Sequence, residues 1–69
     1  MQLSARNQFK GRIKQVKHGD VETEVVVELS AGLEIVSTIT RASAERMRLE
    51  AGMAVFAIVK SSNVILGVD

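Results

Sequence analysis

One nine-residue stretch, from Val21 to Leu29, constrains the fold more than any other part of the chain. Apolar residues and one threonine alternate there with glutamates, so that one side carries Val21, Thr23, Val25, Val27 and Leu29 and the other carries Glu22, Glu24 and Glu28. This period of two is typical of an antiparallel strand with one buried and one solvated face. Val26 interrupts the polar face, and we expect it to contact another subunit.

Four other segments also predict strands. Residues 8–17 alternate imperfectly with their charges on one face, and residues 33–39 alternate again, after turns at residues 18–20 and 30–32. Residues 53–60 form a nearly continuous apolar run, which we expect to be buried on both faces, the second face against another subunit. A turn at residues 61–63 then leads to an expected fifth strand over residues 64–68.

The period changes between the third and fourth of these strands. Ala44, Met47 and Leu49 follow helical spacing, Thr40 is suited to cap the start of a short helix, and Gly52 is suited to a left-handed ending. Five short strands with one helix between strands 3 and 4 predict an all-β fold, a five-stranded OB-like Greek-key barrel.

The size of the chain predicts self-association. With 69 residues it forms one domain, expected to span residues 1–69, and a domain of this size buries only about 60% of its unfolded surface. Disulfides and thiolate metal sites are excluded because there is no Cys, and a single His makes no metal site by itself. Small domains are usually stabilised by disulfides, metal ions or oligomerisation, so assembly into a homo-oligomer is the means of stabilisation that remains.

The charge and apolar pattern exclude several classes of partner. A formal net charge of +1 gives no argument for a general polyanion binder. No apolar run approaches the roughly 20 residues of a membrane span, and the first residues lack the pattern of a secretion signal. We therefore expect a cytoplasmic protein with no membrane partner.

Two polar clusters, one near each end, contain hydrogen-bond donors and no carboxylate. The first is Ser4-Ala5-Arg6-Asn7-Gln8, and the second is Lys60-Ser61-Ser62-Asn63. Hydroxyls, amides, a guanidinium and an ammonium suit an anion held by hydrogen bonds and positive charge. An anion whose oxygens are all acceptors is best held by a site without carboxylates.

These two clusters also carry a family resemblance. The pentapeptide at residues 4–8, Gly11 in the first strand, and Lys60-Ser61 before the apolar end Val64–Val68 resemble the molbindins, small molybdenum-pterin-binding proteins built on one TOBE-like domain. The resemblance runs from Met1 to Asp69. It implies binding, storage or homeostasis of molybdate, and of tungstate, at sites between the subunits of a homo-oligomer, with a hexamer as the expected state.

The resemblance also implies the ligand contacts. The oxyanion-binding residues would be Ser4, Arg6, Thr40, Lys60 and Ser61, with Ala5, Asn7 and Ser62 as supporting residues behind them. Molybdenum would be bound only as its oxyanion, so no residue is assigned as a metal ligand. No pterin is expected, because the chain has no Trp or Tyr to form a platform for its ring.

Each of these residues also has a purely structural explanation. Arg6 and Lys60 can be explained as solvated surface charges, Thr40 can be explained as a helix cap, and residues 61–63 can be explained as a turn. His18 is assigned no role beyond its turn. Only the joint occurrence with residues 4–8 favours a ligand site.

The main alternative function is an OB-type nucleic-acid-binding module. Such modules rely on aromatic stacking and a basic groove, whereas this chain has only two Phe, both expected in the core. A third alternative is a regulatory domain detached from a transcription factor or transporter ATPase. This chain has no helix-turn-helix or phosphate-loop pattern, so by itself it can do neither job. An enzyme is not expected, because no nucleophile–base pair is present and alternation explains the glutamates.

Overall fold

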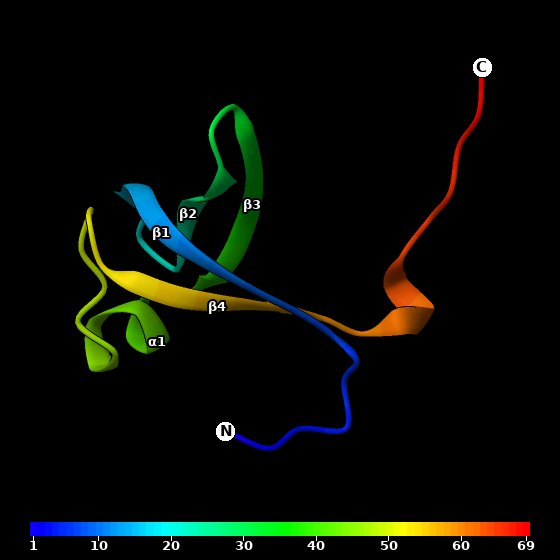
Figure 1. Cartoon of the computed structure of the whole chain (residues 1–69). Coiled ribbons are helices and arrows are strands. Elements are labelled where there is room, and N and C mark those ends of the chain that lie inside the picture. Colours follow the sequence, from blue (N-terminus) through cyan, green and yellow to red (C-terminus); the bar gives the residue numbers. More distant parts are fainter.

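The computed structural model describes all 69 residues and is built on one antiparallel sheet (Figure 1). Its four strands are ordered β3-β2-β1-β4, so β3 and β4 form the two edges. Their bounds are β1 Asn7–His18, β2 Glu22–Ser30, β3 Leu33–Thr40 and β4 Ala54–Val59. The sheet curls into a half-barrel, and the short helix α1, Arg41–Arg46, lies between β3 and β4 in the chain, as expected.

The alternation that predicted the second strand determines the core. Thr23, Val25 and Val27 on β2 are buried, and the two valines pack with Ile13 of β1, while the β2 glutamates are exposed. The polar Thr23 is tolerated because its hydroxyl lies 2.9 Å from Nδ1 of His18. Val21 was expected on the same face but lies before the strand and is exposed.

The imperfect period of the first strand has a physical cause. Between Ile13 and Gln15, β1 has one residue more than β2 opposite, so Lys14 forms a β-bulge. Because of the bulge, the next inward-facing residue after Ile13 is Val16, which packs against the core. It also leaves Lys14 free to pair with Glu34 of β3, and the hydrogen bond and charge of Glu34 raise the pKa of Lys14.

Gly11 on β1 is required by a close approach of β2. A Cβ added there would lie 2.7 Å from the carbonyl oxygen of Glu28 and 2.8 Å from Cγ1 of Val27. Both neighbours belong to a strand fixed by its own pairing on two sides, so neither moves easily.

The helix begins as expected and ends earlier than expected. Thr40 caps it, but the helix stops at Arg46 and not at residues 50–52. Amide N–H groups of Arg48 and Leu49 donate to the carbonyls of Glu45 and Ala44, and Arg48 takes a positive φ of 53°. This is a Schellman ending in which an arginine occupies the position that glycine favours. No helix of the structure is long and apolar enough to span a bilayer.

The fourth strand is half-exposed within one chain, and burial of its second face against another subunit stays a prediction. Val55, Ala57 and Val59 are partly buried, whereas Phe56 and Ile58 on the other face are exposed. Phe9 is also exposed, so the expectation that both Phe lie in the core was wrong. The apolar run of β4 therefore has one face turned toward the core and one apolar face exposed to solvent.

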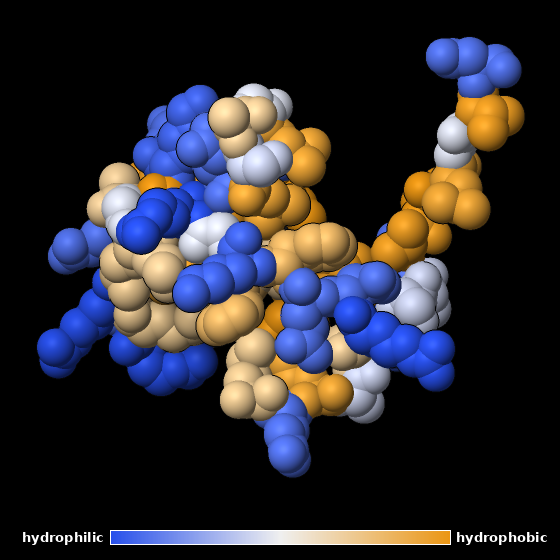
Figure 2. Space-filling model, viewed as in Figure 1, coloured by the Kyte–Doolittle hydropathy of each residue, from blue (hydrophilic) through white to orange (hydrophobic).

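The expected fifth strand is absent from the sheet, so the barrel is not closed within the chain. Residues 64–69, here called the C-terminal tail, leave the 3₁₀ turn η1, Ser61–Asn63, and run away from the half-barrel (Figure 1). Figure 2 shows this apolar segment standing clear of the body of the molecule. Figure 1 shows the segment extended, but it pairs with no strand of its own chain, so the predicted fifth strand is not part of the sheet.

Candidate functional site

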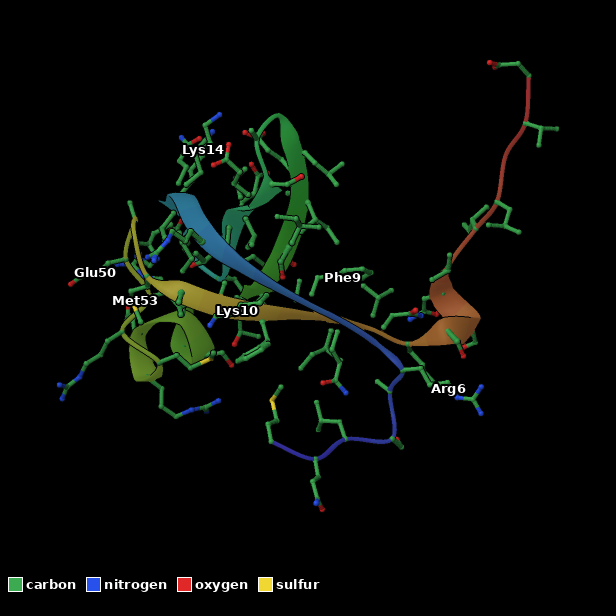
Figure 3. The ribbon with its side chains drawn as sticks, viewed as in Figure 1. Arg6, Phe9, Lys10, Lys14, Glu50 and Met53 are labelled. Atoms are coloured by element: carbon green, nitrogen blue, oxygen red, sulfur yellow. The ribbon has the colours of Figure 1, made fainter.

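Pairing of β1 with β4 brings the two donor clusters together at one end of the sheet. Asn7 pairs with Val59 in antiparallel register, so the next pair outward is Arg6 opposite Lys60. Both side chains are exposed, and Figure 3 shows Arg6 projecting away from the sheet on the side where η1 lies. Two cations from opposite ends of the sequence therefore lie at the same sheet end.

The segment before β1 is held by a side chain of the same cluster. Nε2 of Gln8 donates to the carbonyl oxygen of Ala5 at 2.7 Å, which closes a tight bend. Gln8 therefore orients the arm. Ser4 and Arg6 are exposed on either side of the half-buried Ala5, and Asn7 begins the strand.

The second cluster forms a single turn of 3₁₀ helix. The carbonyl of Lys60 accepts from the amide of Asn63 at 2.9 Å, and the carbonyl of Ser61 accepts from Val64 at 3.2 Å. The hydroxyls of Ser61 and Ser62 are exposed and make no hydrogen bond within the chain. The O–H groups of Ser61 and Ser62 are therefore available to donate to a ligand.

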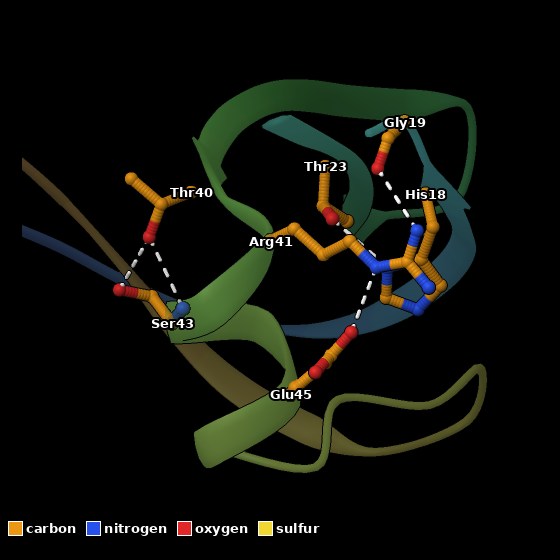
Figure 4. Close-up of polar contacts among 7 residues, drawn as sticks. All are labelled: His18, Gly19, Thr23, Thr40, Arg41, Ser43 and Glu45. Atoms are coloured by element: carbon orange, nitrogen blue, oxygen red, sulfur yellow. Dashed lines mark hydrogen bonds and ion pairs between the residues drawn. The ribbon is translucent and has the colours of Figure 1, made fainter. Parts of the chain in front are cut away.

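Thr40 has a structural role and a polar neighbour that the sequence reading missed. Its Oγ1 accepts from the amide of Ser43 at 3.1 Å and donates to Oγ of Ser43 at 2.8 Å (Figure 4). Two hydroxyls share one bond, so one O–H proton of the pair remains free to donate outward. The capping spacing of three residues was the sequence signal for Ser43.

Arg41 fixes the position of this pair. Its amide donates to the carbonyl of Val21 at 2.8 Å, and its guanidinium bonds Glu45 at 2.7 Å and the carbonyl of Gly19 at 3.3 Å. The start of α1 is thereby tied to the β1–β2 turn, beside the contact of His18 with the buried Thr23 (Figure 4).

The sheet does not bring Thr40 to Arg6 and Lys60. Thr40 pairs with Glu22, next to the end of β1 marked by His18, whereas Arg6 precedes the start of that 12-residue strand. One chain therefore presents two separate donor groups, the Arg6–Lys60 end and the Thr40–Ser43 end.

Neither cation at the Arg6–Lys60 end is neutralised. The two ion pairs of the chain are Lys14 with Glu34 and Arg41 with Glu45. No group of three or more acidic, His or Cys side chains is placed to hold a metal ion. The Arg6–Lys60 end is thus a donor surface with uncompensated positive charge.

An apolar groove lies elsewhere and differs in chemistry. It has a volume of about 420 Å³, and 13 of its 15 lining residues are hydrophobic. Such a lining offers a doubly charged oxyanion almost no hydrogen bonds, so the groove is not its site.

Comparison with known proteins identifies the family to which the chain is similar. The TOBE domain family matches residues 3–66. Molybdenum-pterin-binding protein 2 of Clostridium pasteurianum is 41% identical over 66 residues, which are 96% of this chain and 97% of the relative. The molybdenum transport protein ModE of Azotobacter vinelandii is 50% identical over 96% of this chain, which spans only 24% of the length of ModE.

A solved structure extends the likeness to three dimensions. The cytoplasmic molybdate-binding protein ModG, with molybdate bound, superposes with a TM-score of 0.94 at 40% identity. The match covers all of this chain, its C-terminal tail included, and 49% of the ModG chain. These relatives are binding and transport proteins by name, and none is named as an enzyme, in agreement with the sequence. The chain therefore belongs to the TOBE domain family and, within it, to the molbindins.

Proposed function

We propose that this chain, as a single domain spanning residues 1–69, binds molybdate or tungstate as the free oxyanion and serves its storage or homeostasis in the cytoplasm. The observation that carries the proposal is the meeting of Arg6 and Lys60 at one sheet end, without a carboxylate partner, in a chain of the molbindin family. Relatives named for molybdenum or molybdate support the choice of ligand.

The donors match the chemistry of the ligand. Molybdate presents four oxygen acceptors and no donor. The guanidinium of Arg6 and the ammonium of Lys60 can only donate, and the hydroxyls of Ser4 and Ser61 each add an O–H donor. Charge-assisted hydrogen bonds contribute roughly 1.5–3 kcal/mol each. Several of them, less the ordering costs, support an affinity near micromolar, or about −8 kcal/mol.

The separation of the donor groups supports sites shared between subunits. Thr40 and Ser43 lie beyond the far end of β1 from Arg6, so one chain does not surround an anion with all of them. In a homo-oligomer, for which we propose a hexamer, the Thr40–Ser43 end of one copy would complete the Arg6–Lys60 end of another. Ala5, Asn7 and Ser62 would support the contact residues from behind.

The ligand is proposed to bind without a pterin. The chain has no Trp or Tyr, and its two Phe lie within β1 and β4. Neither the arm residues 4–6 nor residues 60–63 contain an aromatic residue to form a platform for a pterin ring.

Titration calorimetry with molybdate, tungstate, sulfate, a pterin and a short oligonucleotide tests the proposal. Arg6→Gln and Lys60→Gln should each weaken molybdate binding about 10- to 150-fold, the equivalent of one charge-assisted bond. Arg46→Gln and Lys17→Gln are matched controls, because both are exposed cations outside the two donor groups.

The controls should bind molybdate as the unaltered chain does. Equal affinity of Arg6→Gln, Lys60→Gln and their controls would show that the site is elsewhere. Binding of the oligonucleotide in place of the oxyanions would favour the nucleic-acid alternative.

A further inference from the structure

Charged side chains are unevenly divided among the strands of the sheet. β1 carries four cations and no carboxylate, whereas β2 and β3 together carry four glutamates and no cation. β4 carries no charged residue. The sheet is therefore positive along β1 and negative along β2 and β3.

The register of the strands decides which cations have an acidic neighbour. The paired part of β2 begins opposite Arg12, which faces Glu28, and Lys14 forms its ion pair with Glu34 of β3. Residues 7–11 of β1 pair in register with β4, which carries no carboxylate. The beginning of β1 thus extends past the glutamates of the sheet.

The Arg6–Lys60 end lies at this acid-free part of the sheet. Neither residues 1–19 nor residues 51–68 contain an Asp or Glu. Figure 3 shows Arg6 and Lys14 at opposite ends of β1, so the ion pair of Lys14 is remote from Arg6. The carboxylates of the C-terminal residue lie at the end of the outward tail (Figure 1). Within one chain, two positive charges are therefore left for a bound anion to balance.

The charge of the anion decides how well it matches this end of the sheet. A doubly negative oxyanion balances one guanidinium and one ammonium and leaves no net charge behind. A singly negative oxyanion of the same shape accepts the same hydrogen bonds but leaves one cation without a counter-charge. An unbalanced charge is costly where water is excluded, as at a site shared between subunits.

We propose that Arg6 and Lys60 are specificity-determining residues that select the oxyanion by its charge: the site binds doubly negative tetrahedral oxyanions and rejects singly negative ones of the same shape. This inference rests on the proposed function and adds the property of the ligand that the site recognises. A site that recognised only the arrangement of four acceptor oxygens would not make this distinction.

Tungstate and perrhenate are the matched pair of ligands for the test. Both are tetrahedral anions with four oxygens around neighbouring metals of the same row, and their main difference is the charge, which is double on tungstate and single on perrhenate. Titration calorimetry is performed at about pH 8, where Arg6 and Lys60 are charged and both anions are fully deprotonated. The unaltered chain should bind tungstate at least about tenfold more tightly than perrhenate.

Lys60→Gln separates charge from hydrogen bonding, because glutamine keeps an N–H donor and loses the charge. The Coulomb energy with the ammonium is twice as large for tungstate as for perrhenate. If tungstate binding falls about 10- to 150-fold, as expected above, perrhenate binding should fall only by the square root of that factor, about 3- to 12-fold. Arg6→Gln should show the same difference between the two anions.

Two further variants serve as controls. Lys60→Arg keeps the charge and changes the geometry of the donors, so it should keep the preference for tungstate over perrhenate. Lys14→Gln removes the same charge from an exposed lysine that Glu34 already balances. It should change neither affinity by more than about twofold, because charges more than about 8 Å apart are largely screened at physiological ionic strength.

Three results would overturn the charge selection while tungstate binding left the proposed function standing. They are equal affinities of the unaltered chain for the two anions, equal factors of loss in Lys60→Gln, and a preference lost as fully in Lys60→Arg or Lys14→Gln as in Lys60→Gln. Absence of binding of both anions to the unaltered chain would overturn the charge selection and the proposed function together.

Discussion

The contact between Gly11 and β2 gives a sharp test of the register of the sheet. Gly11→Ala adds one methyl group at a point where the backbone of β1 meets the backbone of β2. The new Cβ would lie 2.7 Å from the carbonyl oxygen of Glu28, 2.8 Å from Cγ1 of Val27 and 3.1 Å from Cδ2 of Leu29. Ordinary contacts begin near 3.4 Å, so the first overlap is about 0.7 Å.

The expected cost follows from which atoms must move. Val27 is buried at 4% exposure, and the Glu28 carbonyl belongs to a strand paired on both sides, so relief requires β1 and β2 to separate. Overpacking of this kind costs about 1–3 kcal/mol. Because a domain of this size has only about 3–5 kcal/mol of core stability, the variant loses a large share of its free energy of unfolding.

Thermal unfolding at one fixed protein concentration measures the loss, since the assembly state affects the midpoint. A cost of 1–3 kcal/mol corresponds to a fall in Tm of roughly 5–20 °C for a domain of this size. Gly32→Ala is the comparison, because an added Cβ there meets no atom and costs only about 1 kcal/mol through its φ of +79°. A Gly11→Ala chain as stable as the unaltered protein would refute the described approach of β1 and β2.

Three further predictions concern α1 and the β-bulge. Arg48→Gly should raise the free energy of unfolding by about 0.5–1 kcal/mol in denaturant titrations, because glycine relieves the positive φ that closes the helix; a loss of stability would contradict the Schellman ending. Thr40→Ala should cost about 0.5–2 kcal/mol by removing the cap to Ser43, whereas Thr40→Ser should keep most of it; equal losses would exclude a capping role. Glu34→Gln should lower the pKa of Lys14 in an NMR titration. The contribution of this pair to the free energy of unfolding is complete below the pKa that Lys14 has in the unfolded chain, and it is lost as pH rises through the higher pKa of the folded protein. The Glu34→Gln variant and the unaltered protein should therefore converge in stability at strongly alkaline pH; a difference that persists there would point to another cause.

The parts of the fold that sequence predicted are those decided by local pattern. The alternation around Val25 set the face of β2, and the threonine at position 40 set the start of α1. The bulge at Lys14 was not predictable, because an extra residue in a strand is visible only against its partner strand. The helix end was missed because an arginine, not a glycine, takes the left-handed position after it.

The tail shows a different limit of sequence reasoning. Its apolar residues predicted a strand, and the pattern holds no information on whether the pairing partner is the same chain or another copy.

The hydrogen-bond donors show a similar limit of sequence reasoning. The separate clusters at residues 4–8 and 60–63 were read from composition, and their meeting follows from β1–β4 pairing, but Ser43 was overlooked because its hydroxyl gains its place only through Thr40.

Anomalous scattering from crystals grown with molybdate tests the central claim most directly. The account predicts a molybdenum peak at a boundary between copies, with oxygens within hydrogen-bond distance of Arg6 and Lys60 and of the Thr40–Ser43 pair of a neighbouring chain. A peak far from these side chains, or none at saturating molybdate, would contradict it.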